Sequence, residues 1–468
     1  MTIFKKLSCL IVIVSLLGIP GFSQAQTNTK AEDTSTRYKV TFDHFVKTIT
    51  KTDSKFEEIL IDKLILNYYA ALTVPANEFL IGLKSGYEFN LSTSPHMPEN
   101  TLSLTQTFAR TGSELGLQHS LDSTSGAQTS GLTLSFSQDI AANAFGKSTT
   151  LLHKIAGLET KIAEYQIVES YEAYLAELIS LYYKWYNLFQ NMQTARSSFE
   201  ENKKLLENIK NRQTSSIARP IDVDKISLQI LAKEQSLIRS IENFHLISND
   251  IKSAMGLSES IELVPLKPSI MGSVPKSLDA AFITFKHQSR TYKTLSLLTE
   301  KSQVSLEKEA DDLLPSLQWL MSISATGTGA ALENNATTAF AGLSLSLPLT
   351  KVQDKAAYET AKLTAKKTML SAVNTHDDLK IAMETLFLRI QYQLKQLNLS
   401  EEKIKLAQSV LDYEAENYSY GKVSLNDYID AVNKLDAAKF NKITEETQFQ
   451  QLMLQWLKLT DTLVTEIQ

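Results

Sequence analysis

A heptad pattern that occurs twice, 205 residues apart, is the feature that most limits how this chain can fold. In the first half, apolar or aromatic residues recur at every seventh position, at Tyr171, Leu178, Trp185, Met192, Phe199 and Leu206, with Tyr174, Leu181, Leu188 and Ala195 three positions later. The second half repeats the spacing at Met383, Ile390, Leu397, Ile404, Leu411 and Tyr418. Seams of about five heptads predict long helices packed side by side. A helix of about 65 residues is about 100 Å long, which exceeds any single globular core.

The same offset relates two breaks in the helical pattern, at residues 216–223 and 421–428. Each break ends one helix and starts the next with an acidic residue, Asp222 or Asp427, in the opening turn, where the helix dipole favours negative charge. The 16 glycines and 10 prolines are few for 468 residues, which also favours long helices. The breakers that separate the two halves are Pro265, Pro268, Gly272 and Pro275.

Between the helices, four segments alternate apolar with small polar residues. Their apolar positions are Leu102, Leu104 and Phe108, then Leu132, Leu134 and Phe136, then Leu317, Trp319, Met321 and Ile323, and finally Leu343, Leu345, Leu347 and Leu349. A period of two with one apolar face and one small polar face is typical of a barrel wall between lipid and water. A half-buried sheet in a soluble domain is the alternative. Residues 82–92 also look extended and fit either an extra strand segment or the lead-in to the first strand.

The first residues predict export. Two lysines precede an apolar run at residues 7–17, and small residues at 23–25 suit a signal peptidase, so we expect a signal peptide over residues 1–25. The only cysteine, Cys9, lies in this segment, and the mature chain would therefore lack disulfides and thiol nucleophiles. No later stretch of about 20 apolar residues predicts a transmembrane helix. A membrane role would then require strands closed into a barrel.

Several functional classes are disfavoured by composition. The net charge of -5 comes from mixed acidic and basic residues, unlike the basic face of a nucleic-acid-binding protein. The seven histidines (His44, His96, His119, His153, His245, His287 and His376) show no metal-ligand spacing. Neither a phosphate-binding loop nor a nucleophile elbow is present. The acidic pairs at 311–312 and 377–378 indicate charged helix surface. We therefore expect no enzymatic activity, no cofactor and no metal.

The predicted organisation is a duplicated unit. After the signal peptide at 1–25, we expect a first repeat over 26–268, with N-terminal helices, strands at about 82–140 and a long helix pair at 141–257. A linker at 269–275 follows. The second repeat covers 276–468, with a helix, strands at about 316–350 and a long helix pair at 354–466.

This order of elements resembles the TolC-like outer-membrane efflux and secretion channels over essentially the whole mature chain. Gly131–Gln138 and Gly342–Leu349 resemble the strands with which each half re-enters the helical barrel, and Leu314–Leu317 resembles the helix-to-strand passage. Gly421–Asp427, with Asp430 beyond it, resembles the turn at the periplasmic tip of a helical hairpin.

The resemblance implies a mostly α-helical homotrimer, in which a long coiled-coil barrel continues into a shared twelve-stranded outer-membrane β-barrel with four strands from each protomer. It implies a passive exit duct of a tripartite efflux or type I secretion system, in the outer membrane of a Gram-negative-type cell and extending into the periplasm. Its partners would be outer-membrane lipid, a periplasmic adaptor (membrane fusion) protein and an inner-membrane transporter. A trimer suits the physics, because four strands alone leave two open edges in lipid.

Site residues follow from the same resemblance, position by position. Asp427 and Asp430 match the acidic residues that ring the periplasmic constriction, and Tyr418 and Asp222 match a gate link between neighbouring hairpins. The adaptor-docking tips would include Ser216, Ala218, Gly421 and Ser424. Val423 stands where the family has a basic gate residue, and Ser216 stands where it has the glycine of the first tip. A second restraining link is therefore missing or built differently. Capping of helix N-termini is the alternative role for Asp222, Asp427 and Asp430, and it is compatible with gating.

Two other functions fit the heptads. The first is a periplasmic coiled-coil scaffold or tether, which gains nothing from leucines that face lipid at every second position and would be extracted by salt. The second is a secreted coiled-coil adhesin or lytic factor, which would not remain in the outer-membrane fraction. The sequence leaves the exported cargo open.

Overall fold

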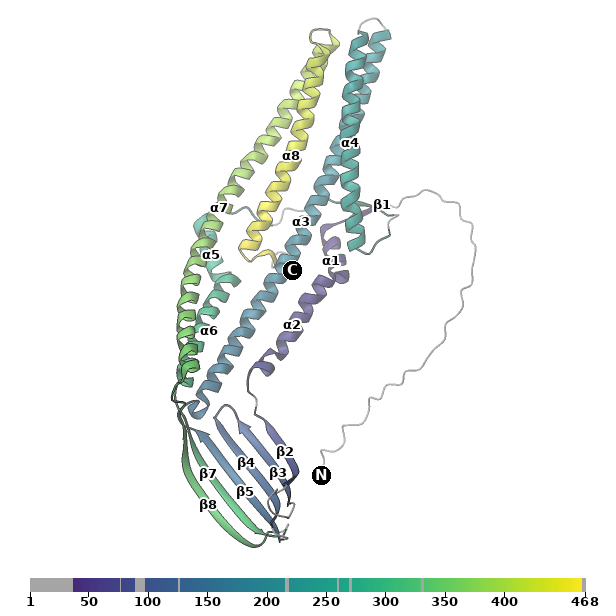
Figure 1. Ribbon diagram of the computed structural model, residues 1–468. Helices are drawn as coiled ribbons and strands as arrows, with labels where there is room; N and C mark the ends of the chain where they lie inside the picture. Colours follow the sequence, from purple (N-terminus) through teal and green to yellow (C-terminus); the bar gives the residue numbers. More distant parts are fainter. Residues whose placement is uncertain are drawn as a thin grey trace, which may run out of the picture.

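The computed structural model describes residues 37–75, 77–88, 97–124, 127–214, 219–258, 261–268, 272–329 and 332–464. Helices form an elongated rod, and a single curved sheet lies at one end of it (Figure 1). The expected signal peptide at residues 1–25 lies outside the described residues.

The helices follow the duplicated plan. Their bounds are α1 Phe42–Thr52, α2 Ser54–Thr73, α3 Lys147–Thr214, α4 Pro220–Ala254, α5 Leu278–Gln288, α6 Arg290–Asp312, α7 Val352–Ser419 and α8 Leu425–Leu459, with a 3-10 turn η1 at Ala144–Gly146. α3 and α7 each have 68 residues, and α4 and α8 each have 35. α7 begins and ends 205 positions after α3, and α8 does the same relative to α4, as the heptads predicted. α7 contains neither glycine nor proline, which explains its uninterrupted length.

Local signals end and restart the helices at the free tip. After α7, Gly421 has a φ of 72°, and its N–H and that of Lys422 donate to the carbonyls of Tyr418 and Asn417. This is the left-handed turn that commonly terminates a helix and for which glycine is preferred. α4 starts with Pro220, which fits a first helical turn because its missing N–H is not needed there.

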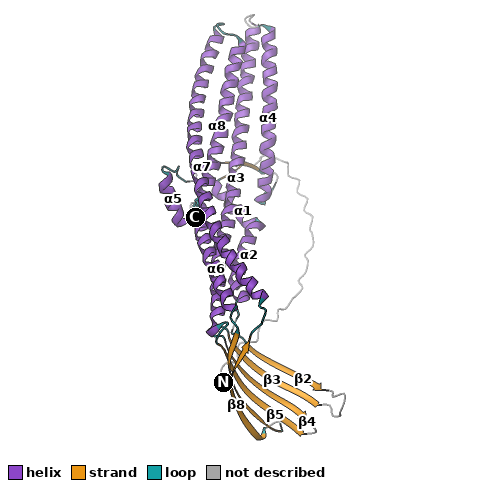
Figure 2. Ribbon diagram, turned by 60° about the vertical axis from the view of Figure 1, so that its left-hand side comes forward, coloured by secondary structure: helices purple, strands orange, loops and turns teal. Residues whose placement is uncertain are grey.

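The long helices lie in one layer, aligned along the rod (Figure 2). Toward the free tip, α3 packs against both α4 and α8, and α8 packs against α7. Toward the sheet, the helices lie side by side in the order α2, α3, α6 and α7. Within the described chain, α7 therefore forms one flank of the layer over its full length, and α2 and α4 form the other.

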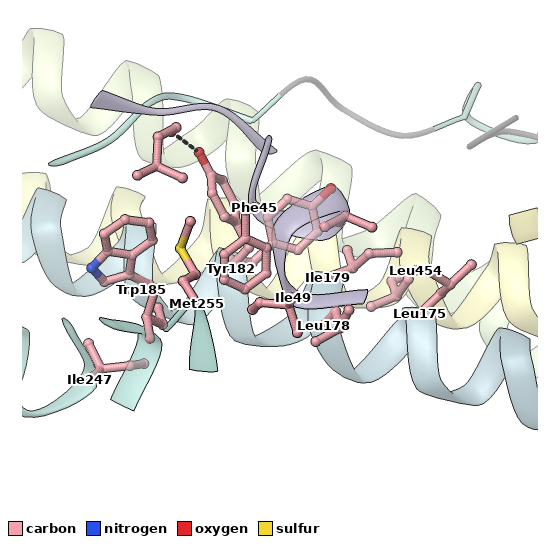
Figure 3. Packing of buried hydrophobic residues seen from close by; sticks show 14 of the residues in the cluster. Phe45, Ile49, Leu175, Leu178, Ile179, Tyr182, Trp185, Ile247, Met255 and Leu454 are labelled. Carbon is pink, nitrogen blue, oxygen red and sulfur yellow. Dashed lines mark hydrogen bonds between the residues drawn. The ribbon is translucent and has the colours of Figure 1, made fainter. Parts of the chain in front are cut away.

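The largest apolar cluster lies midway along the rod, where α1, α3, α4 and α8 meet (Figure 3). Trp185 of the predicted seam and its neighbour Tyr182 are completely buried there. The Tyr182 hydroxyl donates to the carbonyls of Val40 and Leu266. It thereby ties α3 to a two-stranded parallel sheet of β1 (Arg37–Val40) and β6 (Glu262–Pro265). This pairing joins the start of the described chain to the segment between the two halves.

The main sheet has six antiparallel strands in the order β2, β3, β4, β5, β7, β8. Their bounds are β2 Phe79–Glu88, β3 Met97–Phe108, β4 Ser113–Thr124, β5 Ala127–Asp139, β7 Ser316–Thr328 and β8 Glu333–Ser346. The expected class of long helices with an antiparallel sheet is confirmed. The expectation of four strands per chain is wrong: β4 was missed, and residues 82–88 belong to β2. β8 also ends at Ser346, before Leu347 and Leu349.

Among the described residues, no helix combines the length and apolar character needed to cross a membrane.

Candidate functional site

The six-stranded sheet has one apolar and one polar face. Strand register aligns single rows of side chains across all six strands, and one row consists of Ile81, Leu104, Leu117, Leu134, Ile323 and Ala339. The adjacent row, on the opposite face, consists of Gly82, Ser103, Gln118, Thr133, Ser324 and Thr338. On the apolar face, Ile81 is 68% exposed and Ile323 is 54% exposed. A sheet that leaves such a face uncovered in one copy of the chain matches a wall with lipid on one side and water on the other.

The sheet is joined to the helices through a tight rim. The turn between β3 and β4 packs against η1, where Gly146 has a φ of 77° and a Cβ would lie 2.0 Å from the Arg110 carbonyl oxygen. The Gln138 side-chain amide secures the same turn, because its Nε2 donates to the Thr111 carbonyl at 2.7 Å. Burial, and then the nearby Arg110 guanidinium, lower the pKa of His153 on the first turns of α3. The rim therefore fixes the sheet to the rod at the β3–β4 turn.

The opposite end of the rod is the free tip, where the α3–α4 and α7–α8 hairpins meet. A small buried cluster holds them together, formed by Leu205 and Ile209 of α3, Ile226 of α4 and Leu425 of α8. We call these four residues the tip cluster. The predicted gate residues lie around it, apart from the docking residues Ser216 and Ala218, which are outside the described residues.

The two acidic residues of the expected ring have different surroundings. Asp427 caps α8: its Oδ2 accepts from the Ser424 N–H at 3.0 Å and from the Ser424 hydroxyl at 2.7 Å. Hydrogen bonds from the Ser424 hydroxyl and backbone lower the pKa of Asp427, so it stays charged at neutral pH. Asp430 lies almost one turn further on, exposed, and forms an ion pair with Lys434 at 2.7 Å. Asp427 therefore has the helix-capping role given as the alternative to gating. A ring of charge formed by several copies stays a prediction.

Asp222 and Tyr418 both border the tip cluster, but no hydrogen bond joins them among the described residues. Asp222 caps α4 and is held by Arg219, whose backbone N–H and guanidinium both donate to its carboxylate. Tyr418 packs against Tyr428, with ring centroids 5.6 Å apart. Burial raises the pKa of Tyr418, Arg212 opposes the shift, and the Asp222 charge adds to it. The two residues are therefore close enough to interact electrostatically, and a gate link between copies stays a prediction.

A basic contact that the sequence analysis missed connects the hairpins at the tip. The Arg212 guanidinium of α3 lies 4.8 Å from the centre of the Tyr418 ring, and its Nη1 donates to the Ser419 carbonyl at 3.3 Å. Its buried Nε finds no acceptor in the described part of the chain. Arg212 thus places a cation beside Tyr418 within the chain, whereas position 423 holds a valine. Arg212 lies in the last turn of α3, one residue from position 213, which corresponds to Tyr418 by the 205-residue offset. That spacing alone does not bring the two side chains into contact.

A second missed link lies a few turns further from the tip. Lys233 of α4 and the Ser198 hydroxyl of α3 both donate to Asp436 of α8, and the lysine contact is 2.6 Å. All three side chains are largely buried. Nearby, the Gln229 side-chain amide donates to Asn433. We call Lys233, Ser198 and Asp436 the polar latch, since it joins three helices from both hairpins through buried polar groups.

Near the middle of the rod, three carboxylates lie close together. Glu169, Glu172 and Asp461 place one oxygen each within 4.8 Å of one another. The Arg290 guanidinium occupies this position, where it donates to Glu169 at 3.0 Å, to Glu172 and to Asp461. Burial raises the pKa of Glu172 to about 7 despite the attraction of Arg290. With an internal cation already bound, the cluster is an ion-pair network rather than a metal site.

Comparison with known proteins gives a fold but no sequence relative. Neither a protein-family profile nor a curated protein matches the chain. Solved structures match over nearly the whole length. The outer membrane protein VceC of Vibrio cholerae has a TM-score of 0.67 at 13% identity, covering 90% of this chain and 95% of its own. The open state of the MtrE outer membrane channel of Neisseria gonorrhoeae has a TM-score of 0.66 at 10% identity, covering 91% and 90%. The CmeC outer membrane channel of Campylobacter jejuni has a TM-score of 0.62 at 12% identity, covering 95% and 94%.

Proposed function

We propose that this chain, which has the fold of the TolC-like outer-membrane channels, is itself such a channel: a passive, non-enzymatic duct from the periplasm through the outer membrane. The observation that carries the proposal is the sheet with one exposed apolar face and one small polar face, placed at the end of a helical rod. A closed sheet of this kind separates lipid from a water-filled lumen. Three chains would form the duct, and the free tip would lie in the periplasm.

The flanks of the helical layer support assembly with further copies. On α7, an exposed apolar stripe recurs at every seventh residue, at Tyr392, Leu399, Leu406 and Tyr413. On α4, the opposite flank, large exposed apolar residues include Leu228, Leu231, Ile238 and Leu246. Heptad stripes without a partner in their own chain are typical of helices that pack against another subunit. The two flanks differ, so the contact is head-to-tail and generates a ring when its rotation closes.

The direct test is ion conduction by the purified mature chain in planar lipid bilayers, with its mass in mild detergent measured in parallel. We expect a trimer and discrete conductance steps. A water-soluble oligomer without conductance would overturn the channel and favour the periplasmic scaffold or tether.

Two neighbouring substitutions provide a matched control. Leu134 and Thr133 are adjacent on β5 and lie on opposite faces of the sheet. Lysine on the lipid side of a barrel costs about 2–4 kcal/mol near the membrane midplane, whereas the lumen side tolerates charge. Leu134→Lys should therefore abolish membrane insertion, and Thr133→Lys should keep it. Equal behaviour of the two variants would show that neither face meets lipid.

We further propose that the free tip is the gate and the docking site for a periplasmic adaptor, with an inner-membrane transporter supplying the cargo. The residues concerned are Asp427, Asp430, Tyr418, Asp222, Gly421 and Ser424, together with Ser216 and Ala218. Support comes from the polar character of the contacts between the two hairpins there. A tripartite efflux system and a type I secretion system both fit this arrangement.

A further inference from the structure

The first half of the chain carries four strands of the main sheet, whereas the second half carries two. The two inner strands of the first half, β3 and β4, are regular members of the wall. β3 and β4 have 12 residues each, close to the 13 of β5 and β7. They pair over ten consecutive residues without a register shift. Leu104 and Leu117 lie in the same apolar row as Leu134, so the apolar face continues across them.

The β3–β4 hairpin is also fixed to the helical rod. Its turn at residues 109–112 packs against the start of η1. In this turn Gly112 has a φ of 64°, and a Cβ on Gly112 would lie 3.0 Å from the Asn143 carbonyl oxygen. The Asp139 N–H donates to the Gly112 carbonyl at 2.9 Å. A hairpin that merely lay against the outside of a finished wall would not need this close backbone contact.

The width of a six-stranded sheet is close to that of the layer of helices. Helices pack 8–10 Å apart, so four of them side by side span about 36 Å. Strands spaced about 4.8 Å apart and tilted by about 40° occupy about 6.3 Å each, so six span about 38 Å and four only about 25 Å. The six-stranded sheet therefore continues the layer of four helices at nearly constant width.

Both edges of the sheet are open in the described chain, at β2 and β8. β2 leads away from the helices and β8 returns to them, so the two edges run in opposite directions, as antiparallel pairing requires. Their apolar faces are exposed, with Leu83 at 77% and Leu343 at 68%. Open edges in lipid leave backbone groups without partners, which a membrane wall does not tolerate.

We propose that β2 of each copy pairs with β8 of the next, so that three copies close an eighteen-stranded barrel; this inference rests on the proposed function. Barrel diameter grows roughly in proportion to strand number, which makes this lumen about 1.5 times as wide as that of a twelve-stranded barrel. The occupant of each free edge is thus a second copy of this chain, and all six strands belong to the wall.

Disulfide cross-linking in the membrane tests the edge assignment, because Cys9, in the expected signal peptide, is the only natural cysteine. Ile81 on β2 and Leu117 on β4 belong to the same apolar row, which makes them matched positions. Each is changed to cysteine and combined with one cysteine on the same face of β8, scanned over Thr337, Ala339, Ala341, Leu343 and Leu345. The variants are oxidised with copper phenanthroline and analysed on non-reducing gels, with the single-cysteine variants as controls.

A separate pair reports assembly without involving the sheet. Leu228 of α4 and Tyr413 of α7 are exposed on opposite flanks. They lie at a similar level along the rod. Gln229, next to Leu228, contacts Asn433 of α8. Because α7 and α8 are antiparallel and Tyr418 lies beside Tyr428, Tyr413 lies at the level of Asn433. Leu228→Cys with Tyr413→Cys should cross-link neighbouring copies whatever the number of strands.

We expect covalent trimers from at least one Ile81→Cys combination and none from the Leu117→Cys combinations. Trimers from Leu117→Cys alone would overturn the inference, because β4 would then be the edge of a twelve-stranded wall. Cross-linking at the helical flanks with no product from either strand would also overturn it, while leaving the trimer intact. If no cross-link forms at all, including that of the flank pair, the result would contradict the proposed assembly of the channel itself.

Discussion

Replacement of Arg290 by methionine should destabilise the chain in a strongly pH-dependent way. The Arg290 side chain is only 12% exposed and donates to Glu169, to Glu172 and to Asp461. The Glu172 side chain is fully buried, and the Asp461 side chain is 4% exposed. Removal of one partner of such a buried ion pair costs about 3–5 kcal/mol, because the remaining charge is left uncompensated. We expect a loss of this size in the free energy of unfolding at pH 8.

The pH dependence follows from the carboxylates. In the folded wild-type chain, burial raises the pKa of Glu172 from its ordinary value of 4.5 to about 7 and also raises that of Glu169. The folded state therefore keeps a proton that the unfolded chain loses, so stability falls as pH rises from about 4.5 to about 7. Without the guanidinium these pKa values rise further. At pH 5 the Glu172 carboxyl of the variant is neutral, so less charge is left uncompensated and the loss should shrink toward the roughly 1–2 kcal/mol of packing by the arginine stem.

Urea titrations of the detergent-solubilised protein at pH 8 and pH 5, followed by tryptophan fluorescence, measure both values. Lys154→Met is the control, because its ion pair with Glu300 is about half exposed on both sides and should leave the unfolding midpoint unchanged. Equal losses for Arg290→Met at the two pH values would refute the electrostatic explanation and assign the effect to packing alone.

Three further predictions concern the tip and the rim. Asp427→Asn combined with Asp430→Asn should reduce cation preference in planar-bilayer recordings, and unchanged ion selectivity would remove both residues from the pore. Asp436→Asn weakens the polar latch and should raise the opening frequency of single channels several-fold; identical gating would show that the latch does not restrain the tip. Gly146→Ala should sharply reduce the yield of folded trimer, because its Cβ would meet backbone at 2.0 Å, whereas Gly157→Ala, a helical site with open space around it, should fold at least as well as wild type.

Helix lengths were predictable because packing along a seam imposes a strict period. Trp185 and Ile390, on corresponding seam positions of the two halves, are both completely buried. The 205-residue offset of the heptads therefore carries through to the bounds of the helices themselves. Local chemistry, such as the turn at Gly421, then determined where each helix ends.

The number of strands was mispredicted although the signal was present. Leu115 and Leu117 alternate with polar or small residues in β4, as barrel strands require, but His119 interrupts the apolar positions and Gly116 lowers the strand propensity. The short turn at 109–112 contains the charged Arg110, and the whole region resembled a hydrophilic loop. The expectation of four strands came first from the four segments with clear alternation, and the resemblance to a family, which describes an average member rather than this sequence, reinforced it.

The contacts between hairpins could not be predicted for a geometric reason. Arg212 meets Tyr418 only because α3 and α7 have particular rotations about their axes, and a heptad pattern fixes the seam but not the neighbour that each remaining face meets. Lys233 and Asp436 come together for the same reason, since they lie on different repeats. Polar contacts at long range depend on the relative placement of whole helices.

The distribution of these contacts along the rod bears on where a duct of this kind could open. The middle is held by the large apolar cluster around Trp185, so separation of the helices there would expose much apolar surface to water. At the free tip, the apolar contacts of the small tip cluster are supplemented by the polar latch and by Arg212. Polar groups regain hydrogen bonds from water when they separate, and the net cost of parting each pair is therefore small. Motion of α7 and α8 away from α3 and α4 should accordingly begin at the tip and stop at the central cluster.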